Sequence, residues 1–232
     1  MSLLHLSDVH TFIEQFHILE GVSVDVPEGA VVALLGRNGA GKTTTLKTIL
    51  GLTPARSGVV TFDDTDITAL RSFDIAAMGI GYVPEHRAVF SALSVEENLR
   101  LAERSKGDLE RKEDLIFGLF PDLKRLIGLP GTSLSGGQQQ MLAVARALVP
   151  DNKLLLIDEP SEGLAPVLIE QMIEAIAQLS DTTTVLLVEQ NFIVAGRLGQ
   201  TYVIIEEGRS VMSGEMADLV EDEETIQRYL GV

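Results

Sequence analysis

One glycine-rich stretch dominates this sequence, namely Gly36-Arg37-Asn38-Gly39-Ala40-Gly41-Lys42-Thr43-Thr44. It follows the apolar run 31–35, which is typical of a buried strand, and it leads into a segment typical of a helix. Gly36 and Gly41 permit the tight turn in which backbone N–H groups face phosphate oxygens, and the helix start adds its positive dipole end. An ordinary glycine turn is the alternative. Motif and flanks together predict a phosphate-binding loop for a nucleotide, with Lys42 at the β- and γ-phosphates and Thr43 on Mg²⁺.

The overall charge argues against a nucleic-acid partner. The 232 residues carry a formal net charge of −16 at pH 7, and such a chain repels phosphate backbones and anionic lipid headgroups. The densest basic stretch, residues 100–112, has acidic residues interleaved with the basic ones. A solvated helix face is therefore expected there, and no nucleic-acid groove.

Several features that the sequence lacks indicate the cellular compartment of the protein. The chain has no cysteine, which excludes disulfides and thiolate metal sites, and its four histidines show no metal-ligand spacing. The first residues lack the basic and then apolar order of a signal peptide. No apolar run approaches the roughly 20 residues that a membrane-spanning helix needs. We therefore expect a cytoplasmic protein that associates with a membrane only through a partner.

Two kinds of apolar pattern predict two kinds of strand. Polar and apolar residues alternate in three segments, which predicts half-exposed antiparallel strands at 3–12, 22–26 and 59–62. Continuous apolar runs predict parallel strands covered by helices on both faces, at 31–35, 154–157 and 185–188. Near the C-terminus, a hairpin turning at Glu207-Gly208 and then acidic surface helices are expected.

Helical patterns fill the region between these strands. Ser94 and Glu97 form a capping-box pattern at one helix start, and further helices are predicted at 109–120, from Gly136 to Pro150, and at 164–179. The prediction is a single α/β domain over residues 1–232. Its core would comprise 1–84 and 151–232, with an inserted helical subdomain at 85–150.

Two carboxylates end the buried run 154–157. Asp158 is a candidate to hold Mg²⁺ through its water shell, and Glu159 is a candidate to polarise or deprotonate the water that attacks the γ-phosphate. An isolated pair of this kind could equally be polar residues closing a sheet edge. With Lys42 and Thr43 already assigned, the metal and catalytic roles are favoured.

A third motif is the helix start Ser135-Gly136-Gly137-Gln138. Ser135 is a good N-cap, and the two glycines leave the first helical N–H groups open to a ligand. A capped helix that binds nothing is the commoner outcome for such a segment taken alone.

The three motifs, in this order and spacing, resemble the signatures of ATP-binding cassette (ABC) ATPases over essentially the whole chain: Walker A (36–44), the signature (134–138) and Walker B (154–159). The resemblance implies an ABC-type P-loop NTPase fold, with a RecA-like core, an antiparallel β subdomain and an inserted helical subdomain. It implies ATP and Mg²⁺ as ligands. It also implies that two cassettes close head to tail on two ATP molecules, with the signature of one facing the Walker A loop of the other. The implied ATP-binding residues are Gly36, Asn38, Gly39, Gly41, Lys42, Thr43 and Thr44, together with Ser135, Gly136, Gly137 and Gln138.

Segments 82–87, 161–166 and 188–191 narrow the resemblance. They are similar to the second ATPase of branched-chain amino acid importers, which implies ATP hydrolysis coupled to uptake of leucine, isoleucine, valine or related compounds. The implied partners are two permease subunits, a sister ATPase or a second copy, and an extracytoplasmic binding protein. The implied location is peripheral, on the cytoplasmic face of the membrane. Amide and urea importers use similar ATPases, so the substrate stays open.

Several positions depart from the general ABC pattern. Glu85 stands where most cassettes have glutamine, and it can still meet Mg²⁺ or the attacking water. Gln190 replaces the switch histidine, and a neutral amide donates a hydrogen bond to phosphate but carries no charge. Ala165 replaces the usual aspartate, and Ile13, with Phe12 beside it, stands where an aromatic usually stacks on adenine. Two functions therefore stay open, a hydrolytic motor and a nucleotide-gated assembly subunit with weak hydrolysis of its own.

Overall fold

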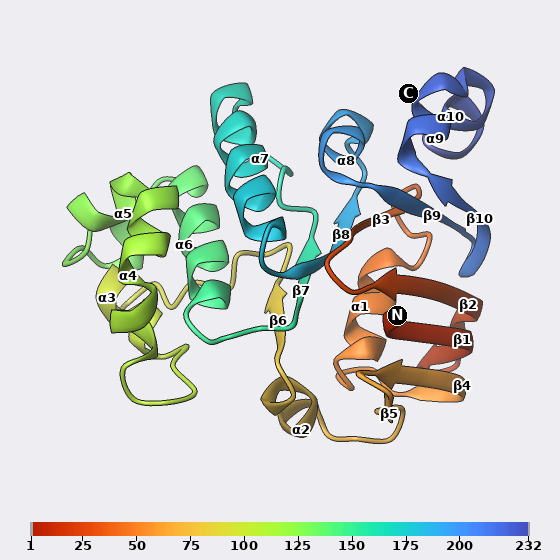
Figure 1. Cartoon of the computed structure of the whole chain (residues 1–232), viewed down its shortest axis with the longest axis horizontal. Helices are drawn as coiled ribbons and strands as arrows, with labels where there is room; N and C mark the ends of the chain where they lie inside the picture. Colours follow the sequence, from red (N-terminus) through yellow and green to blue (C-terminus); the bar gives the residue numbers. More distant parts are fainter. Residues whose placement is uncertain (1, 232) are drawn as a thin grey trace.

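The alternating segments form a four-stranded antiparallel sheet in the computed structural model, which describes residues 2–231 (Figure 1). The strand order is β2-β1-β4-β5, with β1 at Ser2–Ile13, β2 at Phe16–Pro27, β4 at Ala55–Phe62 and β5 at Thr65–Asp66. One face of the sheet is apolar, and Leu4, Leu6 and Phe62 on it are fully buried. The predicted alternation is confirmed, and β1 and β2 extend beyond the predicted segments because they pair with each other up to Ile13 and Phe16.

The continuous apolar runs form the centre of a six-stranded sheet in the order β10-β9-β3-β8-β7-β6. Its strands are β3 (Val31–Leu35), β6 (Ile80–Val83), β7 (Leu154–Asp158), β8 (Thr184–Glu189), β9 (Thr201–Glu206) and β10 (Arg209–Glu215). Pairing is parallel from β9 to β6, and β10 joins β9 as an antiparallel edge. Every residue of β3, β7 and β8 is buried. Parallel strands end at one edge of a sheet, so the segments after these three strands meet there.

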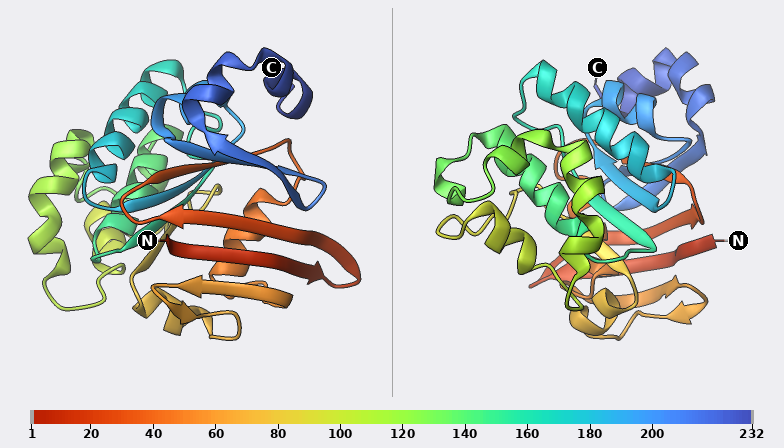
Figure 2. Two further views of the ribbon diagram at one scale, coloured as in Figure 1. Left: turned by 45° about the vertical axis from the view of Figure 1, so that its right-hand side comes forward. Right: turned by 60° about the vertical axis from the view of Figure 1, so that its left-hand side comes forward.

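Helices cover both faces of the parallel sheet (Figures 1 and 2). On one face, α1 (Lys42–Ile49) lies between the two sheets, and Leu46 and Ile49 share an apolar cluster with Leu34. On the other face, α7 (Pro166–Ser180) and α8 (Phe192–Leu198) share a cluster with strand residues that include Leu187. Within residues 2–231, no helix is both long and apolar enough to span a bilayer.

A group of helices lies to one side of the sheet, between β6 and β7 in sequence (Figure 1). It comprises α3 (Val95–Arg100), α4 (Asp108–Leu119), α5 (Pro121–Arg125), a 3-10 turn (Gly131–Ser133) and α6 (Gly136–Leu148). Leu99, Ile116 and Phe120 are buried among these helices. We retain the division into a core (1–84 and 151–232) and a helical subdomain (85–150) as a proposal that this layout supports.

Proline sets two helix boundaries that differ from the predicted ones. The predicted helix 109–120 ends at Leu119, and Pro121 is the first residue of α5. Likewise α7 begins at Pro166, two residues after the predicted start. Proline is favoured at the first helical position because its fixed φ suits a helix and its missing N–H is not needed there. The helix α2 (Ser72–Ala77), β5, β6 and α8 were not anticipated, since short elements show little periodicity.

The C-terminal segment folds back onto the sheet. The predicted hairpin is confirmed, with β9 and β10 joined at Glu207 and Gly208. It is followed by α9 (Met216–Glu221) and α10 (Glu223–Tyr229). These helices are acidic on the surface but bury Leu219 and Ile226 against Tyr202. The Arg37 guanidinium in the phosphate loop donates to the backbone oxygen of Arg228 at 3.1 Å, which links α10 to that loop.

Asn98 generates a prediction about stability. Its fully buried amide accepts from Phe90 N at 2.9 Å and donates to the backbone oxygens of Phe90 and Ser94 at 3.0 and 2.9 Å. Asn98→Ala leaves these groups without their partner, so we expect the free energy of unfolding to fall by about 2 kcal/mol. Thermal unfolding followed by circular dichroism should show a melting temperature lower by about 4–8 °C. The exposed Gln178→Ala on α7 is the control, and equal melting of the two variants would contradict the prediction.

Candidate functional site

Four chemically active side chains meet beyond the carboxyl ends of β3 and β7. Lys42 Nζ lies 3.1 Å from Glu159 Oε1 and donates to the backbone oxygen of Gly36 at 2.8 Å. Thr43 Oγ1 donates to Asp158 Oδ1 at 3.1 Å. Lys42 is 4% exposed and Asp158 is fully buried. The structure therefore brings together two motifs that are 115 residues apart in sequence.

The path of the phosphate loop (residues 36–44) requires glycine at two positions. Gly36 has φ 148°, and a Cβ there would lie 2.3 Å from the backbone oxygen of Ile205 on β9. Gly41 has φ 112°, and a Cβ there would lie 2.9 Å from the side chain of Leu19 on β2. L-residues rarely adopt such φ values, and both contacts are too close. The loop can therefore lie against β9 and β2 only with glycine at these positions.

A cavity of about 420 Å³ lies over the phosphate loop. Its lining residues are Ile13, Ile18, Asn38, Gly39, Gly41, Lys42, Thr43, Thr44, Glu85, Glu159 and Glu162. Of the two adjacent adenine candidates, Ile13 lines this cavity and Phe12 does not. The Phe12 ring instead stacks on His17, with ring centroids 4.2 Å apart, because successive strand residues point to opposite faces. The structure thus adds Ile18 as a second apolar residue beside Ile13.

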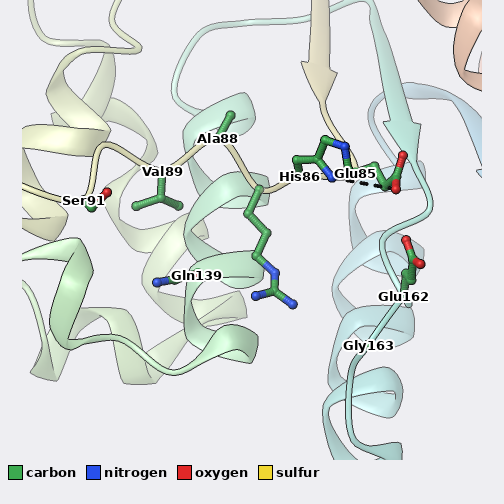
Figure 3. A pocket seen from close by; sticks show the side chains of 9 residues that line it. Glu85, His86, Ala88, Val89, Ser91, Gln139, Glu162 and Gly163 are labelled. Carbon is green, nitrogen blue, oxygen red and sulfur yellow. Dashed lines mark ion pairs between the residues drawn. The ribbon is translucent and has the colours of Figure 1, made fainter.

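Glu85 and Gln190 have different positions relative to this cavity. Glu85 lines it and also a neighbouring cavity of about 520 Å³. Figure 3 shows Glu85 and Glu162 on one side of that second cavity, opposite Gln139. His86 Nδ1 lies 3.7 Å from Glu85 Oε1. Gln190 follows β8 and is exposed, and it lines neither cavity. The structure therefore places Glu85 in the lining of the phosphate-loop cavity. It leaves Gln190 outside that lining, although Gln190 directly follows Glu189, which pairs with Leu35 just before the loop.

The helix start at 135–138 forms a complete capping box. Ser135 Oγ accepts from Gln138 N at 3.3 Å, and Gln138 Oε1 accepts from Ser135 N at 2.9 Å. A Cβ on Gly137 would lie 2.2 Å from the side chain of Leu168 on α7, so glycine permits the close approach of α6 and α7. Ser135 is exposed, and none of the four residues lines the phosphate-loop cavity. Within one chain, the signature residues and the phosphate loop are therefore not brought together.

Asp158 has a second partner that the sequence did not reveal. The hydroxyl of Tyr82, on β6, donates to Asp158 Oδ2 at 3.3 Å. Burial raises the pKa of Asp158, and the hydrogen bonds from Thr43 and Tyr82 oppose that rise. Burial, followed by the nearby Asp158 charge, also raises the pKa of Tyr82. Among residues 2–231, no group of three or more His, Cys, Asp or Glu side chains is gathered as in a metal cluster.

Glu189 is a buried carboxylate with no role assigned from the sequence. It ends β8 with an exposure of 1% and accepts from Ser161 N, Ser161 Oγ and Asn191 N at 3.1, 3.0 and 3.2 Å. Burial raises its pKa to about 7, against the opposing effect of these hydrogen bonds. An available signal was the acidic residue at the end of the apolar run 185–188, the same pattern that identified Asp158.

The sheet order, the glycine loop and the Lys42–Glu159 and Thr43–Asp158 pairs define a P-loop NTPase of the ATP-binding cassette type. The profile of the ABC transporter family matches residues 19–162. The chain belongs to this family, and it is a nucleotide-binding ATPase.

Three similar proteins bear this out. The chain is 42% identical to the high-affinity branched-chain amino acid transport ATP-binding protein BraG of Pseudomonas aeruginosa, covering 99% of this chain and 100% of BraG. It is 34% identical to the lipopolysaccharide export system ATP-binding protein LptB of Escherichia coli, covering 92% of this chain and 91% of LptB. A solved ATP-binding subunit of an ABC transporter has a TM-score of 0.84 at 28% identity, covering 99% of this chain and 97% of that one.

Glu189 generates a prediction about pH-dependent stability. Its pKa rises from 4.5 in the ordinary case to about 7 in the folded protein. Between these pH values the folded protein holds a proton that the unfolded chain has released, so the free energy of unfolding falls as pH rises. Glu189→Gln lacks this contribution. Relative to that variant, the wild type should lose about 3 kcal/mol between pH 4.5 and pH 8.

Urea unfolding at several pH values measures this difference. Glu174→Gln, which removes an exposed carboxylate on α7, is the control and should show no such pH trend relative to wild type. A constant difference between wild type and Glu189→Gln at all pH values would show that Glu189 does not titrate as described.

Proposed function

We propose that this chain hydrolyses ATP to energise an importer of branched-chain amino acids. It would work on the cytoplasmic face of the membrane with two permease subunits, a partner ATPase and an extracytoplasmic binding protein. The observation that carries the hydrolytic role is the Lys42–Glu159 pair at 3.1 Å beside the Thr43–Asp158 pair. The similarity to BraG over both full lengths supports the substrate class.

The donor set at this site fits Mg²⁺. The Thr43 hydroxyl and the Asp158 carboxylate both supply hard oxygen atoms, which lie 3.1 Å apart. Mg²⁺ in nucleotide sites is typically held by one or two carboxylates together with phosphate oxygens and water. Glu85, which lines the same cavity, is a further candidate ligand. When bound, Mg²⁺ would neutralise the charge that develops on the β- and γ-phosphates.

The remaining chemistry falls to residues of this chain. The phosphate-loop N–H groups and Lys42 would bind the β- and γ-phosphates of ATP, with Ile13 and Ile18 as apolar contacts in the cavity. Glu159 would accept a proton from the water that attacks the γ-phosphorus, and the bond to the β,γ-bridging oxygen breaks to release ADP and phosphate. Glu159 has φ 46°, in the left-handed region. This strain of about 1–3 kcal/mol is typical of functional positions.

The helix start at 135–138, whose N-cap residue Ser135 is exposed, supports assembly into a head-to-tail pair. Its first-turn N–H groups form an anion site, and the capping box uses only the N–H groups of Ser135 and Gln138. Since these residues do not line the phosphate-loop cavity of their own chain, a second cassette would bring them to the γ-phosphate.

Glu159→Gln tests the hydrolytic role. In the assembled transporter this variant should hydrolyse ATP about 10²–10⁴-fold more slowly, because an amide cannot accept the proton. ATP affinity should change little, since Lys42 and the loop are intact. Turnover and binding of a radiolabelled nucleotide are the measurements. Glu162→Gln, which removes a neighbouring exposed carboxylate of the same cavity, is the control. Normal turnover of Glu159→Gln would refute the assignment.

A nucleotide-gated assembly subunit with weak hydrolysis is the second candidate function. It is favoured by the neutral side chain of Gln190 and by its position outside the cavity lining. The two functions are separated by removing the catalytic glutamate from each cassette of the transporter in turn. If only the partner's substitution abolishes turnover, the second candidate is correct. Stimulation of the ATPase by leucine with the binding protein, compared with urea and short-chain amides, tests the substrate class.

A further inference from the structure

The buried carboxylate of Glu189 joins two loops of the catalytic edge. One is the base loop (residues 159–165), which begins with Glu159 and continues to α7. The other is the switch loop (residues 190–191), which joins β8 to α8. Oε1 of Glu189 accepts from Ser161 N, and Oε2 accepts from both Ser161 Oγ and Asn191 N. One side chain therefore holds a backbone group of each loop.

On the base-loop side, Ser161 is a fixed point of a tight turn. Ser161 is 7% exposed, and its backbone oxygen accepts from Leu164 N at 3.3 Å. Before it, Glu159 N donates to the backbone oxygen of Val188 at 2.9 Å. Glu159 is therefore held between β8 and the Ser161 turn, and Glu189 fixes the second of these two supports.

On the switch-loop side, the contacts of Glu189 fix the backbone on both sides of one residue, Gln190. Gln190 lies between Glu189, which is in the strand, and Asn191, whose N–H the Glu189 carboxylate binds. Asn191 Oδ1 in turn accepts from Ile193 N at 3.1 Å and caps α8. The backbone of Gln190 is thus held on both sides, while its side chain is exposed.

The two oxygens of the Glu189 carboxyl group suit this arrangement. An ionised carboxylate has two oxygens and accepts all three donors, whereas an amide has only one acceptor oxygen. Burying such a group is unfavourable unless hydrogen bonds compensate, and here the compensating donors belong to the two loops. The Glu189 carboxylate therefore constrains the base loop and the switch loop at once, in addition to its place in the packing of β8.

We propose that Glu189 is a positioning residue that couples the base loop to the switch loop, so that Glu159 and Gln190 keep a joint geometry around the γ-phosphate. The proposal rests on the hydrolytic function above. It places no contact between Glu189 and the nucleotide. Loss of the coupling should therefore lower kcat and leave the KM for ATP nearly unchanged.

Two variants test the coupling in the full-length chain assembled with its transporter. Ser161→Ala removes one donor, and Glu189→Gln removes acceptor capacity. Each should lower kcat about 10- to 100-fold, as expected for a misplaced catalytic group, with the KM for ATP within about 3-fold. Ser161→Thr keeps the hydroxyl and should restore kcat. The control is Glu170→Gln, which breaks the exposed Arg197–Glu170 ion pair at 2.7 Å between α7 and α8.

Hydrogen exchange of the chain itself provides a readout that does not depend on turnover. In Ser161→Ala, amide exchange should rise in residues 190–193 as well as in 159–165, because the perturbation passes through Glu189. In Glu170→Gln the exchange of both segments should stay at the wild-type level. Unchanged exchange at 190–193 in Ser161→Ala, or a kcat within 2-fold of wild type in both variants, would overturn the proposal. A wild type without ATPase activity would instead refute the proposed function, and the exchange data would still decide the coupling.

Discussion

The parallel register of three buried strands is the constraint on which the rest of this structure depends. Leu35 of β3 pairs with Glu189 of β8, and Val188 of β8 pairs with Asp158 of β7. Because the strands run in one direction and end at nearly the same level, three segments from distant parts of the chain emerge side by side. These segments are the phosphate loop, the base loop and the switch loop. A shift of the register by one residue would also move each side chain of the shifted strand to the opposite helix-covered face of the sheet.

Two acidic residues at that edge, Asp158 and Glu189, illustrate how the fold uses buried charge. Both end apolar strands, and burial raises the pKa of both carboxyls. The burial of the Asp158 carboxylate is compensated by hydrogen bonds from side-chain hydroxyls of other elements. A cation could replace these hydroxyls without moving the backbone. The burial of the Glu189 carboxylate is compensated in part by backbone N–H groups of adjacent loops. Breaking these hydrogen bonds would therefore disturb the backbone of both loops. The same residue pattern therefore accounts for the proposed ligand site in one strand and the proposed link between two loops in the next.

Local chemistry made much of this structure predictable from the sequence. The alternation in β1, the apolar runs of β3, β7 and β8, and the capping pattern at Ser94 depend on near neighbours, and the structure confirms them. Partners distant in sequence were not predictable in this way. Tyr82 reaches Asp158 only because β6 pairs with β7, and Ser161 meets Glu189 only because β7 pairs with β8. Phe12 and Ile13 could not be separated as adenine candidates until the orientation of β1 was known.

The helix start at 135–138 and the phosphate loop do not meet within one chain. The helix start at 135–138 has an exposed N-cap at Ser135, two glycines and the dipole of an anion site, yet it does not line the cavity over its own phosphate loop. The phosphate loop lies beside a lysine, a hydroxyl and two carboxylates, yet none of the residues 135–138 lines its cavity. The helix start and the phosphate loop therefore offer complementary groups for binding one nucleotide. Under the proposed function, a complete site would therefore belong to a pair of cassettes, and closure of that pair, rather than the binding of ATP by one chain, would be the step passed on to a membrane partner.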